Sequence, residues 1–157
     1  MEFTTDIFSR FHEGWALLTA GTREDYNTMT ISWGGMGTLW GKPVVTVYVK
    51  PIRHTFGYME RNGFFTVSFY PEERKPDLLL LGTKSGRDGD KVALTGLTPA
   101  FLEQGVTFAQ AEATLVCRKL YAQDLDREAM PKAVTESVYA TEAPHRMYIG
   151  EVVEILR

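Results

Sequence analysis

Apolar residues along the chain alternate with polar ones or form short runs, a pattern that predicts a mainly β protein with helical inserts. Strands are predicted over residues 15–20, 27–33, 44–49, 64–69, 113–121 and 146–156. Helices are predicted over 55–61, 76–81 and 126–139, the last despite Pro131. We expect a break in the strand pattern at the glycines of 34–37, a polar loop or helix end over 82–90, and irregular structure over 92–108.

The second predicted strand has two different faces. On an alternating pleat, one face carries Thr28, Thr30 and Ser32, and the other carries Met29, Ile31 and Trp33. The glycines that follow indicate backbone close to another group, so Met29 or Trp33 is expected to flank a planar ring while backbone groups reach its polar edge. The alternative is an ordinary half-exposed strand that ends in a turn.

A second candidate set combines cations with hydroxyls. Arg53, Arg87 and Lys91, with Thr55 and Ser85, offer the guanidinium, ammonium and hydroxyl donors that hold a phosphate, and Arg53 lies just before a predicted helix. The alternative is that Arg53 is solvated, and that Arg87 and Lys91 pair with the aspartates of their own loop.

Four stretches of the chain together indicate the class of ligand. Hydroxyls, cations, aromatic groups and exposed glycine backbone occur over 27–34, 50–55, 85–91 and 145–155. A phosphorylated, planar, redox-active ligand needs all of these groups. The combination suggests a flavin.

Composition limits the alternatives. The 157 residues, 44% of them hydrophobic and 24% charged, fit a single domain over 1–157. The net charge of -3 argues against nucleic-acid binding through a general basic surface. The one cysteine, Cys117, excludes an intrachain disulfide and thiolate metal clusters, and we expect it to be a small buried residue. With no signal-like start and no membrane-length apolar segment, we expect a cytoplasmic protein.

The chain has few residues suited to acid–base or nucleophilic catalysis. Its three histidines are His12, His54 and His145, and no Ser-His-Asp or Cys-His arrangement is indicated. We expect no metal site. His145 enters the last predicted strand, either as an ordinary strand-start residue or facing the flavin or a partner subunit.

Six segments, in order, resemble the flavin reductase-like, flavoredoxin-type family. They are WALLTAG at 15–21, NTMTISWG at 27–34, VYVKPIRHT at 47–55, FTVSF at 65–69, SGRDGDK at 85–91 and YIGEVV at 148–153. The resemblance runs from about Gly14 to the C-terminus. It implies an FMN-binding split β-barrel of Greek-key type, usually a homodimer with one FMN per subunit near the interface.

The resemblance also assigns residues to the cofactor. By position, the flavin ring and ribityl chain would be lined by Asn27, Thr28, Met29, Thr30, Ser32 and Trp33. The phosphate would be held by Arg53, Thr55, Ser85 and Lys91. Gly86 and Arg87 belong to the same loop, and His54 stands where relatives often carry an aromatic residue. These thirteen residues are the predicted cofactor site.

The chemistry that this family implies is hydride transfer from nicotinamide C4 to flavin N5, which requires no general base. The leading prediction is an NAD(P)H-dependent flavin oxidoreductase, with NADH or NADPH as the electron donor. Such an enzyme either reduces free flavin for a partner such as a flavin-dependent monooxygenase, or passes electrons from bound FMN to a redox partner protein. One alternative is a flavoredoxin-like electron carrier, and another is a non-enzymatic flavin-binding module. Split barrels that oxidise pyridoxamine phosphate fit less well. The apolar strands 44–49 and 64–69 give loose support to a dimer.

Overall fold

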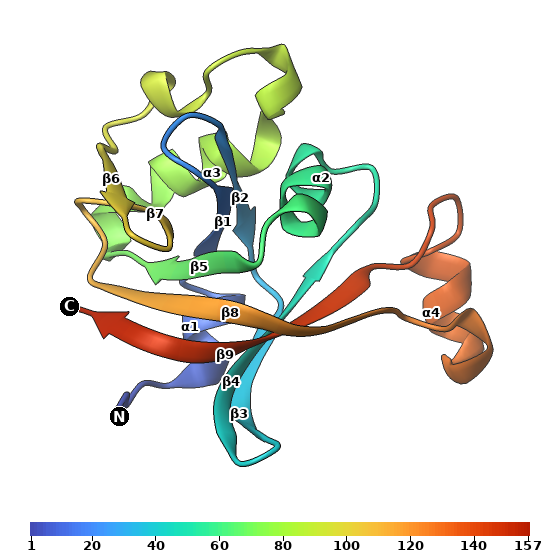
Figure 1. The fold of residues 1–157 in the computed structure, drawn as a ribbon. Coiled ribbons are helices and arrows are strands. Elements are labelled where there is room, and N and C mark those ends of the chain that lie inside the picture. Colours follow the sequence, from blue (N-terminus) through green and yellow to red (C-terminus); the bar gives the residue numbers. More distant parts are fainter.

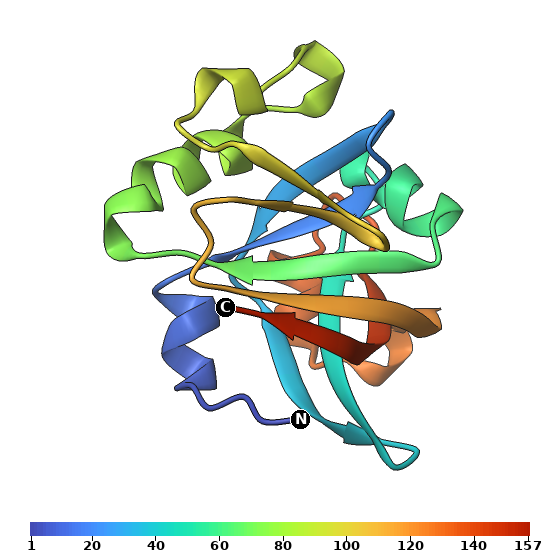
Figure 2. The same cartoon turned by 60° about the vertical axis from the view of Figure 1, so that its left-hand side comes forward.

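The computed structural model describes all residues, 1–157. Seven strands form one antiparallel sheet in the order β2-β1-β5-β8-β9-β4-β3. Their bounds are β1 Ala16–Gly21, β2 Tyr26–Ile31, β3 Gly34–Leu39, β4 Lys42–Val49, β5 Phe64–Phe69, β8 Ala113–Asp124 and β9 Arg146–Leu156. The sheet is strongly coiled, and the end strands β2 and β3 are joined by a corner of only two residues (Figures 1 and 2). The predicted mainly β fold with helical inserts is confirmed.

Helices and a small hairpin cover the coiled sheet. The helices are α1 Ile7–His12, α2 His54–Arg61, α3 Lys75–Thr83 and α4 Lys132–Ser137, and short 3₁₀ turns lie at Glu72–Arg74, Gly86–Asp88, Val92–Leu94 and Arg127–Ala129. The hairpin consists of β6 Pro99–Leu102 and β7 Gly105–Phe108. Both α2 and α3 pack against β2. They therefore flank the strand that carries the first predicted ligand motif.

Three sequence predictions about local structure were wrong. The glycines of 34–37 do not break the strand pattern: they pair with β4 as the start of β3. Gly34 allows Phe11 to pack on the strand, because a Cβ there would lie 2.6 Å from the Phe11 ring. The segment 92–108 contains the β6–β7 hairpin. The helix predicted over 126–139 is reduced to a 3₁₀ turn and the six-residue α4, which begins directly after Pro131.

The core lies inside the coiled sheet and beneath α3. The larger cluster includes Val45, Val67 and Tyr148, and a smaller one joins Leu17 to Leu78 and Leu81 of α3. Most apolar side chains of β5 and β4 are thus buried within this chain, and these strands lend no support to a dimer interface. Cys117 is fully buried, as predicted, and burial raises its pKa.

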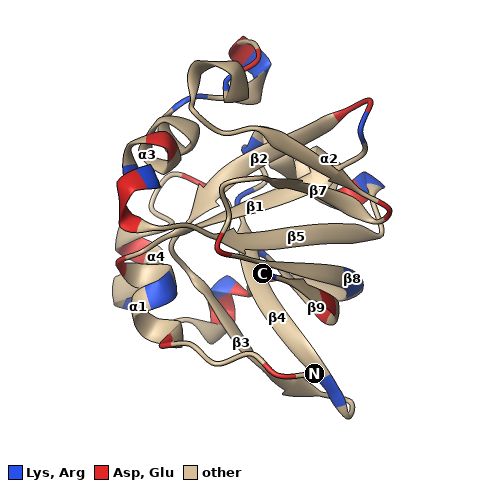
Figure 3. Cartoon of the chain, turned by 90° about the vertical axis from the view of Figure 1, so that its left-hand side faces the viewer, with Lys and Arg blue, Asp and Glu red and all other residues tan.

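The strands β8 and β9 extend beyond the barrel and carry residues 125–145, including α4, to one side of the molecule (Figure 1). A hydrogen bond from the Leu125 amide to the His145 carbonyl, 3.0 Å, closes the base of this excursion. Acidic and basic residues are interspersed over the elements, in keeping with the small net charge (Figure 3). The chain contains no helix with the length and apolar character needed to span a bilayer.

Candidate functional site

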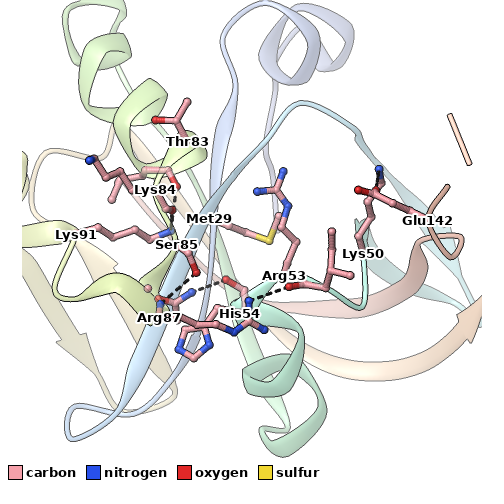
Figure 4. A pocket seen from close by; sticks show the side chains of 15 residues that line it. Met29, Lys50, Arg53, His54, Thr83, Lys84, Ser85, Arg87, Lys91 and Glu142 are labelled. Atoms are coloured by element: carbon pink, nitrogen blue, oxygen red, sulfur yellow. Dashed lines mark hydrogen bonds and ion pairs between the residues drawn. The ribbon is translucent and has the colours of Figure 1, made fainter. Parts of the chain in front are cut away.

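A basic pocket of about 340 Å³ lies beside β2, between the start of α2 and the end of α3. That volume is within the ~300–1,000 Å³ typical of small-molecule sites. Lys91 and Ser85 stand on one side of the pocket and Arg53 on the other, with Met29 reaching between them (Figure 4). Segments that are far apart in sequence therefore converge on one concave surface.

Nine of the thirteen residues of the predicted cofactor site line this basic pocket. They are Asn27, Met29, Arg53, His54, Thr55, Ser85, Gly86, Arg87 and Lys91. The other four, Thr28, Thr30, Ser32 and Trp33, do not line it.

The two threonine hydroxyls of β2 are used inside the protein. Thr28 is fully buried, and its Oγ1 lies 2.8 Å from Thr19 Oγ1 and donates to the Leu18 carbonyl. Thr30 Oγ1 donates to the carbonyl of Leu78 in α3. The side chains of β2 that open to the basic pocket are Asn27 and Met29, because α3 packs against the strand.

Ser32 and Trp33 form the corner between β2 and β3, where they line a separate groove of about 1,050 Å³ beside α1. The Trp33 side chain is half exposed, and its ring centroid lies 5.2 Å from that of His145. The structure therefore separates the corner residues from the basic pocket and places them next to the base of the β8–β9 excursion.

The basic pocket has a surplus of positive charge. Five cations line it, Lys50, Arg53, Lys84, Arg87 and Lys91, against one carboxylate, Glu142, which pairs with Lys50. None of the ion pairs joins Arg87 or Lys91 to an aspartate of their own loop. Arg87 Nη1 instead donates to the Ile52 carbonyl at 2.9 Å. Such a surplus favours an anionic ligand.

Lys91 is buried at the centre of this charge, with 6% of its surface exposed. Its Nζ donates to the carbonyls of Leu81 and Lys84, at 2.9 and 3.1 Å, and so caps the C-terminal end of α3. Because an ammonium has three N–H donors, one remains for a ligand. Burial, together with the positive charge of Arg53, lowers the pKa of Lys91 to about 8. A bound anion would reverse that shift.

The start of α2 offers further donors. Arg53 is the N-cap residue, and no side chain caps the first helical amides, which a phosphate could satisfy. The Thr55 hydroxyl accepts from Asn27 Nδ2 and the Ser85 hydroxyl accepts from the Arg87 amide, so both keep their own hydrogen for donation. The donor set fits a phosphate monoester.

The packing of the loop 85–91 beside this helix start depends on glycine. Gly86 packs so closely on β2 that a Cβ would lie 2.2 Å from Asn27 Oδ1 and 2.8 Å from the His54 ring. His54 packs edge-on against Tyr58, with ring centroids 5.3 Å apart. Burial and the nearby charges of Arg87 and Lys91 lower the pKa of His54. The imidazole is therefore neutral at pH 7.

Six residues that line the basic pocket are absent from the predicted cofactor site: Lys50, Ile52, Leu81, Thr83, Lys84 and Glu142. Lys50 and Ile52 belong to the stretch 50–55 that was singled out, and the positive charge of Lys84, next to Ser85, was a usable signal. Glu142 reaches the pocket only through the β8–β9 excursion, so no local pattern indicates it.

Solved structures of flavoproteins share the fold. An FMN-binding protein from Thermus thermophilus is 20% identical, with a TM-score of 0.73 over 100% of this chain and 79% of that one. A flavoredoxin from Methanosarcina acetivorans is 18% identical, with a TM-score of 0.72 over 99% and 74%. A nitrilotriacetate monooxygenase component B homologue from Mycobacterium thermoresistibile is 15% identical, with a TM-score of 0.71 over 92% and 68%. The predicted split β-barrel is confirmed.

The family follows from the sequence itself. No curated protein sequence gives a significant match to the chain. The family model described as "Flavin reductase like domain" matches residues 8–157, nearly the whole chain. Together with the split barrel, this match shows that the chain belongs to the flavin reductase-like family.

Proposed function

We propose that this chain binds FMN in its basic pocket and works as an NAD(P)H-dependent flavin oxidoreductase. The observation that carries the proposal is the convergence of five cations and an uncapped helix start on a pocket with a single carboxylate. A phosphate monoester with nearly two negative charges matches that surplus. The family match and the FMN-binding neighbour support the choice of FMN.

In this proposal the phosphate is held where cations and hydroxyls meet. Arg53 and Lys91 supply charge, Thr55 and Ser85 supply hydroxyl donors, and the first amides of α2 complete the set. Asn27 and Met29, which open to the pocket from β2, contact the ribityl chain and the ring. Arg87 is tied to the Ile52 carbonyl and closes the rim.

Bound FMN supplies the redox chemistry, because it accepts a hydride from a reduced nicotinamide. The chain's own work is to bind and orient the two rings and to keep water from the reacting faces. The basic pocket holds no paired nucleophile and base, and its one histidine, His54, is neutral. Hydride transfer needs neither a nucleophile–base pair nor a charged histidine.

Two uses of the reduced flavin remain to be distinguished. The fold neighbour that is a monooxygenase component B homologue supports delivery of electrons to an oxygenase partner. The flavoredoxin neighbour supports the alternative of an electron carrier that receives electrons from another redox protein. Assembly as a homodimer also stays a prediction, which light scattering would test.

The proposal is tested by an anaerobic visible spectrum of the FMN-loaded protein. We expect the flavin bands to bleach rapidly after addition of NADH or NADPH, and the faster of the two identifies the donor. Bands that persist with both nucleotides, but bleach when a reduced redox protein is added, would replace the reductase with the electron carrier. Bands that persist with every donor would leave the non-enzymatic flavin-binding module.

A further inference from the structure

A buried pair of side chains lies on the base of the β8–β9 excursion, outside the predicted cofactor site. The Tyr139 hydroxyl and His145 Nδ1 are 2.6 Å apart, and the two residues are 4% and 9% exposed. Both backbones are held in place: Arg127 donates to the Tyr139 carbonyl, and the Leu125 amide donates to the His145 carbonyl. The pair is therefore a fixed element of the fold.

The sheet register places this pair next to the basic pocket. Val49 of β4 pairs with Arg146 of β9, so the next residues outward, Lys50 and His145, stand opposite each other. Lys50 lines the basic pocket, and its partner Glu142 belongs to the excursion. On its other side the His145 ring meets the half-exposed Trp33, 5.2 Å between centroids. His145 thus lies between the pocket rim and the corner of β2 and β3.

The hydrogen-bond inventory decides which nitrogen of His145 carries the hydrogen. If Nδ1–H donated to Tyr139, the buried hydroxyl would have no acceptor for its own hydrogen, which is unfavourable for a buried donor. If the hydroxyl donates to Nδ1, both groups are satisfied and the ring hydrogen resides on Nε2. Nε2 has no hydrogen-bond partner in the chain and is not fully enclosed, so its hydrogen is available to a ligand.

Burial and the positive charges nearby keep His145 neutral. Burial lowers the pKa of His145 most, and the charges of Lys50 and Arg53 lower it further. Glu142 has a smaller, opposite effect, and the resulting pKa is about 4. At pH 7 the imidazole therefore donates through one N–H only. Its acceptor nitrogen is occupied by Tyr139.

We propose that Tyr139 is a positioning residue that fixes His145 in the neutral Nε2–H tautomer, and that this N–H donates to the polar edge of the ring system bound at the basic pocket. The proposal rests on the proposed function for the identity of that ring system. A preorganised neutral donor stabilises negative charge that develops on a ring during reduction. Tyr139 acts through His145, by holding its hydrogen on the outward nitrogen.

The first test uses the protein without flavin. Long-range ¹H–¹⁵N spectra resolve the tautomer of each of the three histidines, and a His145→Gln variant assigns the signal. At pH 7 we expect His145 to be predominantly the Nε2–H form. In Tyr139→Phe, which keeps the ring and loses the hydroxyl, we expect a mixture of the two tautomers. A wild-type Nδ1–H form, or an unchanged His145 signal in Tyr139→Phe, would overturn the positioning role.

The second test adds FMN and compares two histidines. His54 lines the basic pocket, so its signal reports FMN binding itself. We expect the His54 signal and the His145 Nε2 signal to shift together. A shift of His54 alone would refute the donor role of His145 while FMN binding stood. The absence of both shifts would refute the proposed function.

Kinetics give a readout that folding alone would not move. We expect Tyr139→Phe to lower the rate of flavin reduction about tenfold, the effect of one lost hydrogen bond, with little change in the KM for the nicotinamide. Tyr121→Phe is the matched control, because that hydroxyl contacts only Gln123 on the exposed part of β8. Equal rates for both variants and the wild type would contradict the proposal.

Discussion

Asn27 Nδ2 donates a hydrogen bond of 2.7 Å to Thr55 Oγ1, which joins β2 directly to the first turn of α2. Both side chains are buried, and both line the basic pocket. Because the two residues come from different predicted ligand motifs, this bond links the ring-binding and phosphate-binding parts of the site. It also sets the surface on which Gly86 packs.

Gly86→Ala is expected to damage the site. The new methyl would lie 2.2 Å from Asn27 Oδ1, so either the loop or Asn27 must move, at a cost of about 1–3 kcal/mol in the free energy of unfolding. We expect weaker FMN binding as well, because Asn27 holds Thr55. Urea unfolding and FMN titration measure the two effects. Gly63→Ala is the control, since a Cβ there meets nothing within 4 Å, and equal behaviour of the two variants would contradict the packing argument.

Arg53→Ala is expected to separate FMN from riboflavin. The Arg53 side chain takes part in no ion pair of the chain and lines the basic pocket, so its proposed partner is the phosphate. Loss of a charged hydrogen bond should weaken FMN about 10- to 100-fold and leave riboflavin nearly unchanged. Fluorescence titration with each ligand measures this. Lys132→Ala removes a cation on α4, with the side chain 86% exposed, as a control. An equal loss for both ligands would remove Arg53 from the phosphate site.

FMN affinity is expected to fall as pH rises through 8. In the free protein the pKa of Lys91 is about 8, and a bound phosphate raises it, so FMN binding takes up a proton above that pH. Binding is therefore strongest below pH 8 and weakens by up to about tenfold per pH unit above it. Titrations between pH 7 and 9 check this, with riboflavin as the reference. A flat FMN profile would show that the phosphate does not interact with Lys91.

The same lowered pKa predicts how the ligand-free protein responds to pH. Between about pH 8 and the ordinary lysine value of 10.5, the unfolded chain binds more protons at Lys91 than the folded chain does. The contribution of Lys91 to stability therefore rises with pH across that window. Urea unfolding of the wild type and Lys91→Met measures the difference. A contribution that falls over this range would contradict a lowered pKa of Lys91 in the folded protein.

Glu142→Gln is expected to strengthen FMN binding a few-fold. Glu142 is the only carboxylate that lines the basic pocket, and it pairs with Lys50. Its neutralisation raises the positive potential and frees the Lys50 ammonium, so association should be faster, most clearly at low salt. Stopped-flow fluorescence measures that rate. Slower association in the variant would mean that Glu142 orders the excursion more than it opposes the ligand.

The sequence predicts those elements whose residues act locally. Segments 64–69 and 146–156 are strands with the predicted bounds, because β-branched and aromatic residues run along them between glycine or polar breaks. Helix α1 was missed: it has only six residues and is capped by Asp6. The prediction at Gly34 was wrong because the missing side chain makes room for the Phe11 ring and does not mark a turn.

The site residues also divide into those that a local sequence pattern indicates and those that depend on the tertiary structure. Arg53 and Thr55 are close in sequence, so a short motif indicates them, and the loop 85–91 carries its own signal. The resemblance assigns Thr28 and Thr30 to the ligand by position, whereas their hydroxyls donate to the carbonyls of Leu18 and Leu78; alternation defines two faces of a strand without showing which one α3 covers. Glu142 depends on pairing between β8 and β9 over a long excursion, which no local pattern encodes.

The central claim, that the basic pocket recognises FMN through its phosphate, is tested most directly by calorimetric titration of the purified, flavin-free protein with FMN and with riboflavin at pH 7. The account predicts uptake of one FMN per chain, with an affinity at least about tenfold higher than for riboflavin. Absence of stoichiometric FMN uptake, or equal affinities for the two ligands, would contradict it.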